Sequence, residues 1–526
     1  MRDESLQLLI EHQGTHTFLD VNLRGCKAGT IILSATINGE TITFPYELRE
    51  RPRKGNEHHS FTAADVIYLL MPDRFTGTIN GIRRQLPYLA DLGITTLWLT
   101  PVINATSYHG YDIIDFYTVN PRFGTMDDYQ ALVREAHQLG LKVIMDFVFN
   151  HCSSKHTWLQ QPPEEDWINH PDGSLITNYR LTPVVDPYAA DIDRQQTVEG
   201  WFVKTMPDLN LRNRHLLTYL TQCTMWWIET ADLDGIRMDT LPYSDHDAMQ
   251  QWLNTLHHEY PHLHVVGEAW VCNSAFTARM QHGALDSAMD FALFEAFNYA
   301  KHEDSNEAWS GLNRIYNTLC YDYLYDDPSM TMAFLDNHDV NRFLENEPQP
   351  RTIARLKAAL AILLTIPRIP QIYYGTEILM YGNTQQGDNN VRRPFPDGRK
   401  DRSHNAFLPS GRSKEEADMH RYLRRLLQWR KNCPAIHHGT TKQFMPYKGI
   451  YVIARQYQDT LIVTIVNGND RSVTYHPERY AELFSAMPLG AYITGKDIIT
   501  GRTITLNKPF RLAPNKAIIC KVIRNK

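Results

Sequence analysis

The chain has 526 residues, of which 43% are hydrophobic and 21% are charged, a balance that is typical of globular proteins. This length allows two or three domains and at least one large core. The net charge is −6 and no long run of Lys or Arg occurs, which argues against a nucleic acid or an acidic membrane as a partner.

Cysteine usage and the N-terminus bear on the compartment. The seven cysteines are odd in number and scattered, and no CxxC pair occurs, so neither a zinc ribbon nor a disulfide framework is indicated. The opening MRDESLQLLIEHQG lacks a basic segment followed by a long apolar run, which argues against a signal peptide, and no apolar stretch reaches membrane-spanning length. We therefore expect a cytoplasmic protein, or a periplasmic one if the true N-terminus lies upstream.

Residues 1–58 are predicted to form a short N-terminal β segment. The stretches GTIILSATING (29–39) and ETITFPYEL (40–48) alternate between apolar and polar residues and are separated by glycine. Because some fifty residues are few for an independent β domain, we expect this segment to pack on the neighbouring domain.

Residues 59–436 alternate between short apolar runs and amphipathic helical stretches. Eight apolar runs separated by helices predict a parallel sheet, and eight such units favour a closed (β/α)₈ TIM barrel. An open doubly wound sheet is the alternative, but no GxGxxG or P-loop follows the first run. The runs are 66–71, 95–101, 142–150, 235–240, 264–270, 287–294, 332–337 and 369–375, and the helices are 81–92, 125–139, 214–230, 246–259, 351–364 and 413–432.

Two further regions depart from this alternation. Residues 151–213 are rich in Pro, Asp, Tyr and Trp and lack a helical period, so they predict an inserted subdomain after the third strand, above the C-terminal mouth of the barrel. Residues 437–526 are β-patterned and predict a C-terminal antiparallel β-sandwich, with an Asn-Gly turn at 467–468.

Acidic residues occur at four of the predicted strand ends, where barrel enzymes place their chemistry. Asp146 lies in the third strand, and Asp239, Glu268 and Asp339 end or follow the fourth, fifth and seventh. Arg237 shares a side-chain direction with Asp239 if the chain is extended, and a guanidinium there keeps a carboxylate ionised and able to act as a nucleophile.

Two reaction classes fit three carboxylates and an arginine. One is glycoside hydrolysis with retention, and the other is Mg²⁺-dependent chemistry on an enolase-type barrel. Arg237 favours the first, because a guanidinium competes with a metal. Three histidines, His109, His151 and His338, accompany the acids and suit sugar hydroxyls; a zinc site is the rival interpretation, but no HxH or HExxH spacing supports it.

The motifs DFVFNH (146–151), MPDLN (206–210), GIRMDT (235–240), GEAW (267–270) and FLDNHD (334–339) resemble, in order, the signature regions of the α-amylase family of glycoside hydrolases. The likeness covers roughly residues 60–520 and is closest to the cyclomaltodextrinase, neopullulanase and maltogenic amylase group. It implies a catalytic (β/α)₈ barrel that acts on α-glucans.

The resemblance also implies roles for matching residues. Asp239 matches the nucleophile, Glu268 the general acid/base, and Asp339 the carboxylate that binds the 2- and 3-hydroxyls of the distorted sugar. Arg237 matches the arginine that orients the nucleophile, and Asp146 the aspartate that anchors it. The apolar run around Glu268 predicts that desolvation raises the pKa of its carboxyl.

Other matches concern the sugar subsites. His338, His151 and His109 match histidines that bind the sugar in subsite −1, and Tyr68 matches the tyrosine that stacks under it. The remaining candidates are Asp388 and Arg392 on the −2 side and Trp270 on the leaving side.

Departures from the family pattern affect the cofactor and partner predictions. TLPY (240–243) lacks the Lys and His that many α-amylases use for substrate and calcium, so we predict no metal-binding residue and no required cofactor, with a structural calcium ion as the alternative. Asp208 replaces the lysine of the group's M-P-K-L-N motif. The N-terminal segment is about half as long as the group's domain, which helps to form a dimer there, so a homodimer is one expected state.

The leading hypothesis is therefore a retaining hydrolase of α-1,4 bonds in maltooligosaccharides, cyclodextrins, pullulan or starch. A transglycosylase or disaccharide isomerase on the same scaffold is an alternative. A non-catalytic sugar-binding relative is a third, but such proteins usually lose one of the three carboxylates, and all three are present. A Mg²⁺-dependent enzyme would lose its activity in EDTA.

Overall fold

The computed structural model describes residues 8–13, 16–21, 23, 26–485 and 493–523. At its centre is an eight-stranded parallel sheet in which β5 pairs with both β6 and β14. A parallel bridge between Met289 and Met332 joins the two edges, so the sheet is a nearly closed barrel, and the predicted fold is confirmed. The strands are β5 (Ile67–Leu70), β6 (Thr96–Leu99), β9 (Lys142–Phe147), β10 (Gly235–Met238), β11 (Val265–Gly267), β12 (Ser287–Ala288), β13 (Met332–Phe334) and β14 (Ile369–Tyr373).

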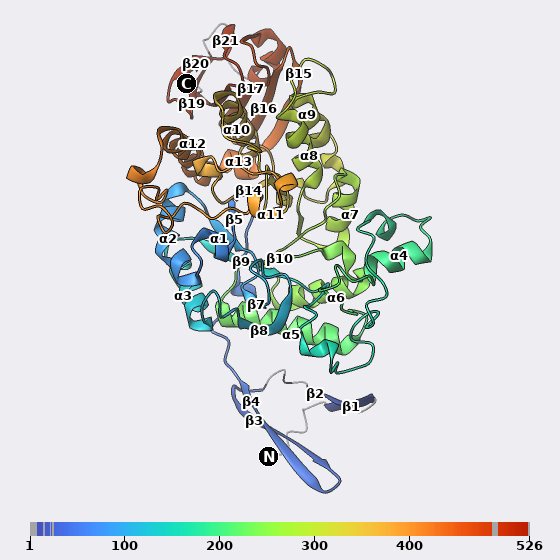
Figure 1. Cartoon of the computed structure of the whole chain (residues 1–526). Helices are drawn as coiled ribbons and strands as arrows, with labels where there is room; N and C mark the ends of the chain where they lie inside the picture. The colour runs from blue at the N-terminus through green and yellow to red at the C-terminus, as the bar shows by residue number, and fades with distance from the viewer. Residues whose placement is uncertain (1–7, 14–15, 22, 24–25, 486–492, 524–526) are drawn as a thin grey trace.

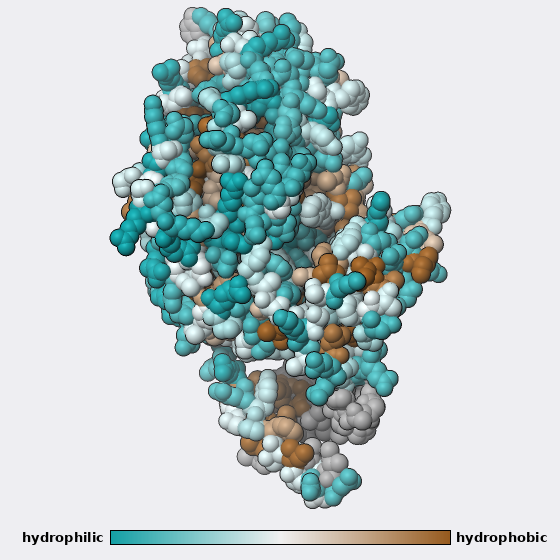
Figure 2. Space-filling model, in the orientation of Figure 1, coloured by the Kyte–Doolittle hydropathy of each residue, from teal (hydrophilic) through white to brown (hydrophobic). Residues whose placement is uncertain are grey.

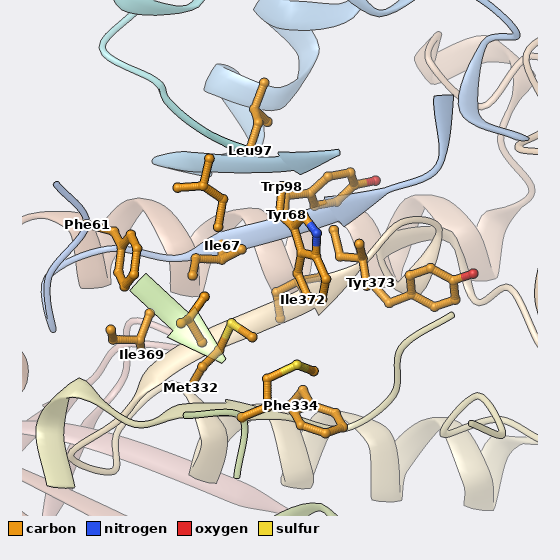
Figure 3. Close-up of a cluster of buried hydrophobic side chains, with 14 of the residues drawn as sticks. Phe61, Ile67, Tyr68, Leu97, Trp98, Met332, Phe334, Ile369, Ile372 and Tyr373 are labelled. Atoms are coloured by element: carbon orange, nitrogen blue, oxygen red, sulfur yellow. The ribbon is translucent and has the colours of Figure 1, made fainter. Parts of the chain in front are cut away.

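Apolar side chains of neighbouring barrel strands form one continuous core (Figure 3). Ile67, Leu97, Met332 and Ile369 are all fully buried, although they come from four different strands. The strands are mostly apolar because side chains on both faces are covered, by the barrel interior or by helices.

Helices surround the barrel, and the six predicted ones lie within two residues of their expected bounds. Local signals explain this agreement: the Thr125 hydroxyl, for example, accepts from the Asp128 N–H to cap α3. No helix in the described ranges has the length and apolar character of a membrane span. The helices are α1 (Pro72–Phe75), α2 (Ile79–Leu92), α3 (Met126–Gln138), α5 (Arg214–Ala231), α6 (His246–Glu259), α7 (Ser274–Ala284), α8 (Phe291–Ala300), α9 (Leu312–Leu319), α10 (Pro350–Leu363), α11 (Asp388–Val391), α12 (Lys414–Lys431) and α13 (Pro434–His438).

The sixth apolar run, 287–294, is only partly a strand. β12 ends at Ala288, and Asp290 then caps α8 by accepting from the Leu293 N–H at 2.9 Å. The prediction of a strand through residue 294 is wrong because a short apolar run has no period that separates a buried strand from a buried helix. The hairpin of β7 (Ile103–Ala105) and β8 (Ile113–Val119) was not predicted either.

The insert after β9 contains α4 (Asp191–Val198), which projects to the right of the barrel in Figure 1. Antiparallel bridges, one from His151 to Asp208 and one from Ile168 to Leu209, tie its two ends together. The insert therefore returns to its starting point beside the end of β9, where it can wall a cleft.

The C-terminal region is an antiparallel six-stranded sheet with a separate two-stranded pair, β18 (Val473–Tyr475) and β21 (Phe510–Leu512). The predicted Asn-Gly turn is wrong. Asn467 ends β17, and its amide donates to the carbonyls of Arg471 and Ala513, while the β16–β17 turn contains Gln458 with φ 50°. The sheet strands in spatial order are β15 (Thr440–Tyr447), β16 (Ile450–Tyr457), β17 (Thr460–Asn467), β22 (Ala517–Ile523), β19 (Thr494–Asp497) and β20 (Thr503–Thr505).

The N-terminal segment forms two hairpins, β1 (Leu8–Gln13) with β2 (His16–Val21) and β3 (Gly29–Ile37) with β4 (Glu40–Leu48). The predicted strands are present, but the β3–β4 hairpin does not pack on the barrel as expected: it extends away from it (Figure 1) and carries brown apolar surface in Figure 2. Ile32 and Phe44 are 58% and 55% exposed. The linker makes the contact instead, through ion pairs of Arg51 with acidic residues of α5 and α6.

Candidate active site

A cleft of about 620 Å³ lies beyond the C-terminal ends of the barrel strands. The β7–β8 loop, the insert and the residues that come after β10, β11 and β13 form its wall. Eight of the predicted site residues line it, namely His109, His151, Asp239, Glu268, Trp270, Asp339, Asp388 and Arg392. Asp146, Arg237 and His338 are buried behind this wall, and Tyr68 lies elsewhere.

Arg237 is the centre of the buried part of the site. Its Nη1 donates to Asp146 Oδ1 at 2.9 Å and to Asp239 Oδ1 at 2.6 Å, and its Nη2 lies 3.0 Å from Glu268 Oε2. β9, β10 and β11 are adjacent parallel strands, so the residues at their ends meet around one guanidinium. A single arginine thus neutralises part of the charge of three carboxyls.

Burial shifts the pKa values of both carboxyls that face the cleft. Burial raises the pKa of Asp239 to about 7, although Arg237 lowers it, and the charge of Asp146 raises it further. Arg237 therefore favours the ionised form of Asp239, as predicted, but it shares its charge among three carboxyls. Burial also raises the pKa of Glu268 to about 7, the direction that its apolar run predicted.

The pair Asp239 and Glu268 consequently holds one proton near neutral pH. We place that proton on Glu268, because Arg237 is closer to Asp239 than to Glu268. The Thr240 hydroxyl also donates to Asp239 Oδ2 at 3.2 Å. One ionised and one protonated carboxyl face the cleft together, which is the pairing that a nucleophile and a general acid require.

Thr240 positions both carboxyls at the cost of backbone strain. Its φ of 44° lies in the left-handed region, which β-branched residues rarely adopt. In this conformation its N–H donates to Glu268 Oε2 at 3.0 Å, while its hydroxyl reaches Asp239. Sequence patterns contained no signal for this role.

Asp339 is held from two sides. Arg392 Nη2 donates to its Oδ1 at 2.8 Å, and His338 Nε2 lies 3.1 Å from its Oδ2. Burial opposes ionisation, yet these neighbours hold the pKa of Asp339 below its usual range. Arg392 also lies 3.4 Å from Asp388, so the two −2 candidates are ion-paired at the cleft. A fixed, ionised carboxylate here can accept hydrogen bonds from sugar hydroxyls.

Tyr111, which sequence reasoning did not select, occupies the place expected of Tyr68. Tyr68 is fully buried in the barrel core (Figure 3), and its hydroxyl donates to Glu377 at 2.8 Å, so it cannot stack on a sugar in the cleft. The Tyr111 ring lines the cleft and stacks on His338 with an interplanar angle of 6°. Its hydroxyl lies 3.0 Å from Asp146 Oδ2 and 2.7 Å from His338 Nε2.

The signal for Tyr111 was present in the motif YHGYD (108–112). Gly110 has φ 89°, and a Cβ there would meet the Pro101 carbonyl oxygen at 2.4 Å, so only glycine fits this turn. The turn directs His109 and Tyr111 into the cleft, with their rings stacked 5.9 Å apart.

The cleft histidines are neutral near pH 7. Burial lowers the pKa of His151 to about 4 and that of His338 to about 3, and it also lowers the pKa of His109. His151 Nε2 is buried and has no hydrogen-bond partner among the residues that the structure describes, which leaves it for a ligand hydroxyl. His338 contacts Tyr111 and Asp339 instead of lining the cleft.

Aromatic side chains of the insert complete the wall. Phe202 stacks on His151 at 5.2 Å and contacts Tyr179 and Tyr243 edge-on. The composition of the insert suggested a functional loop, but nothing in its pattern distinguished these residues. Trp270, which also lines the cleft, is 45% exposed and stacks on Phe291 at 5.2 Å.

The residues present fit a calcium ion only in part. Within the described ranges Asn150 Oδ1 is buried without a hydrogen-bond partner, and the buried carboxylate of Asp208 accepts from Asn169 at 2.8 Å. Calcium takes about six to eight oxygen ligands. In the part of the chain that the structure describes, no three His, Cys, Asp or Glu side chains group to hold a metal.

Comparison with known families assigns most of the chain. Residues 48–462 match the model described as alpha amylase, catalytic domain, and residues 441–521 match the cyclo-malto-dextrinase C-terminal domain. The first match covers the barrel with its insert, and the second covers most of the C-terminal sheet.

Individual relatives agree with this assignment. Alpha-amylase 2 of Dictyoglomus thermophilum is 28% identical over 79% of this chain and 68% of its own length. A cyclomaltodextrin glucanotransferase of Geobacillus stearothermophilus is 29% identical over 84% of this chain but only 60% of its own length. The solved alpha-amylase of Geobacillus thermoleovorans, complexed with acarbose, is 28% identical with a TM-score of 0.74, over 89% of this chain and all of that one.

Proposed function

Since this chain belongs to the alpha-amylase family of glycoside hydrolases, we propose that it cleaves α-1,4-glycosidic bonds of α-glucans with retention of anomeric configuration. The observation that carries the proposal is the sharing of Arg237 by Asp239 and Glu268. Two carboxyls that share one guanidinium are neighbours in the cleft, which supports a retaining pair, about 5–5.5 Å apart, over an inverting pair, which stands about 6.5–9.5 Å apart to seat a water.

The first step forms a covalent intermediate. The Asp239 carboxylate attacks the anomeric carbon while Glu268 gives its proton to the glycosidic oxygen, so that bond breaks and the leaving chain departs as an alcohol. Asp339 holds hydroxyls of the distorted sugar, and His151 Nε2 supplies another polar contact. In the second step the Glu268 carboxylate takes a proton from water, which attacks the anomeric carbon and releases Asp239.

We propose maltooligosaccharides, cyclodextrins, pullulan and starch as the substrate class. The names of the relatives, which refer to amylases and cyclomaltodextrin, support this range, as does the acarbose bound by one of them. Transfer to a sugar is the second candidate, because the exposed Trp270 beside Glu268 offers an acceptor a stacking surface in competition with water.

Product analysis tests the proposal. The protein would be incubated separately with β-cyclodextrin, pullulan, soluble starch and maltotriose, with Asp239→Asn as the control, and the anomeric form of new ends followed by NMR. We expect α-anomeric products; new linkages from maltotriose would identify transfer. Products of the β-anomer, or no product from any of the four sugars, would overturn the proposal.

We further propose that the chemistry needs no metal, because protein side chains supply the nucleophile, the acid and the positive charge. EDTA should leave kcat unchanged. A lower Tm in EDTA that calcium restores would show a structural ion, and loss of kcat in EDTA would contradict the proposal.

A further inference from the structure

A second groove, of about 460 Å³, lies beside the cleft on the surface of α7, α8 and α9. In Figure 1 these helices follow one another along one side of the barrel, between the insert and the C-terminal sheet. None of the residues that line this groove takes part in the site described above, so its function is unassigned by the catalytic mechanism.

Exposed aromatic rings are among the residues that line the groove. Trp309 is 75% exposed, and Tyr299 and Tyr321 are 48% and 49% exposed. Tyr299 is held in place because the Arg314 guanidinium lies 4.6 Å from its ring centroid and is itself fixed by two hydrogen bonds to Glu303. Large aromatic faces left in water and held in place are suited to a ligand with an apolar face.

Polar side chains line the groove together with these rings, namely Glu295, Arg314 and Asn317. Carboxylate, guanidinium and amide groups donate and accept hydrogen bonds in the directions that sugar hydroxyls need, while the rings cover the sugar faces. The chemistry of the groove therefore fits an oligosaccharide.

Two short stretches of chain connect the groove with the cleft. Trp270 lines the cleft, Cys272 lines the groove, and the chain runs from one to the other two residues later. In the same way, Phe291 supports Trp270 by stacking, and its neighbour Ala292 lines the groove. Because Glu268 protonates the oxygen of the leaving chain, the sugars beyond it pass Trp270 first.

We propose that this groove binds the leaving-side portion of a long α-glucan chain, which runs from Glu268 past Trp270 to Trp309. The inference rests on the proposed function and extends it to chain length. Substrates that reach the groove gain an aromatic contact that short ones cannot make, and an acceptor oligosaccharide bound there would be held in line for transfer.

The test compares substrates of two lengths. Trp309→Ala and Tyr321→Ala should each lower kcat/KM for maltoheptaose about three- to tenfold, through KM, while leaving maltotriose unchanged. Trp309→Phe should retain most of the wild-type value because it keeps an aromatic face. Tyr188→Ala is the matched control: Tyr188 is 93% exposed but lies in the insert, outside both the cleft and the groove.

A binding measurement separates this inference from the catalytic one. In the Glu268→Gln variant, calorimetry should show weaker maltoheptaose binding when Trp309 is also changed to Ala. If the wild type cleaves no α-glucan yet Trp309→Ala weakens maltoheptaose binding, the groove proposal is supported and the proposed reaction is wrong. Equal effects on both sugar lengths, unchanged binding, or a change of oligomeric state in Trp309→Ala without a change in KM would overturn the groove proposal.

Discussion

Two buried arginines of this barrel each form ion pairs with carboxylates, but they differ in how many of their hydrogen bonds are satisfied. Arg237, at the cleft, faces three carboxyls and leaves Nε and Nη2 without a well-aligned hydrogen bond. The pKa values of these carboxyls, on Asp146, Asp239 and Glu268, are raised by burial to between about 6 and about 7.

Arg368, just before β14, is as deeply buried, but all three of its guanidinium nitrogens donate hydrogen bonds. Its Nε donates to Asp290 at 3.0 Å, its Nη2 donates to Asp322 at 2.6 Å, and its Nη1 also donates to the Pro328 carbonyl. Neither Arg368 nor these partners line the cleft. The Arg368 cluster, in which every guanidinium nitrogen is hydrogen-bonded, stabilises the fold. In the Arg237 cluster three carboxyls share one positive charge, so a carboxyl there retains a proton that it can donate to a substrate.

Neutralising one carboxyl in each cluster tests this difference most directly. Asp239→Asn and Glu268→Gln should each lower kcat by about 10³-fold or more, because each removes a group that reacts. Asp322→Asn should keep near-wild-type kcat, although it loses an ion pair with Arg368. Steady-state kinetics with circular dichroism as a folding check decide the matter; an active Asp239→Asn enzyme would refute the assignment.

Removal of the arginines should separate stability from activity. Arg237→Met and Arg368→Met each leave buried carboxylates unpaired and should lower the free energy of unfolding by about 3–5 kcal/mol. Without Arg237 its three partners have still higher folded-state pKa values than in the unfolded chain, so stability falls as pH rises from about 5 to 7. Urea unfolding at both pH values measures this; a loss that is greater at pH 5 would contradict it.

Two tyrosines extend the comparison, because each donates to a buried carboxylate. Tyr111→Phe removes a hydrogen bond to Asp146 in the Arg237 cluster and should lower kcat/KM about tenfold. Tyr68→Phe removes one to Glu377 and should cost about 1 kcal/mol of stability with kcat/KM unchanged. If the two variants have equal kinetics, Tyr111 is only structural.

The last comparison concerns the pH profile of kcat/KM. The pair Asp239 and Glu268 is active with one proton, so kcat/KM should fall about tenfold per unit above pH 7, as Glu268 loses its proton. It should also fall on the acidic side, where Asp239 gains one. Arg368→Lys should leave both limbs in place. If the alkaline limb persists unchanged in a Glu268→Gln variant whose activity is rescued by azide, a group other than Glu268 produces that limb.

Sequence reasoning succeeded where the signal was local and failed where distant segments decide. The cap of α3 and the acids at strand ends could be predicted, because each depends on neighbours in the chain. Tyr68 and Tyr111 were confused because both stand in motifs with aromatic residues. Only the packing of β14 and Glu377 over Tyr68 shows that it faces the core.

By itself the sequence determined the order of barrel strands and helices, the insert, the C-terminal sheet and the positions of the acids at strand ends. The tertiary structure decided that three carboxyls share Arg237, that Thr240 is strained between two of them, and that Trp309 and Tyr321 meet in one groove. The physical reason is range: hydrophobic periods and caps act over a few residues, whereas desolvation and charge sharing depend on atoms that only folding brings together.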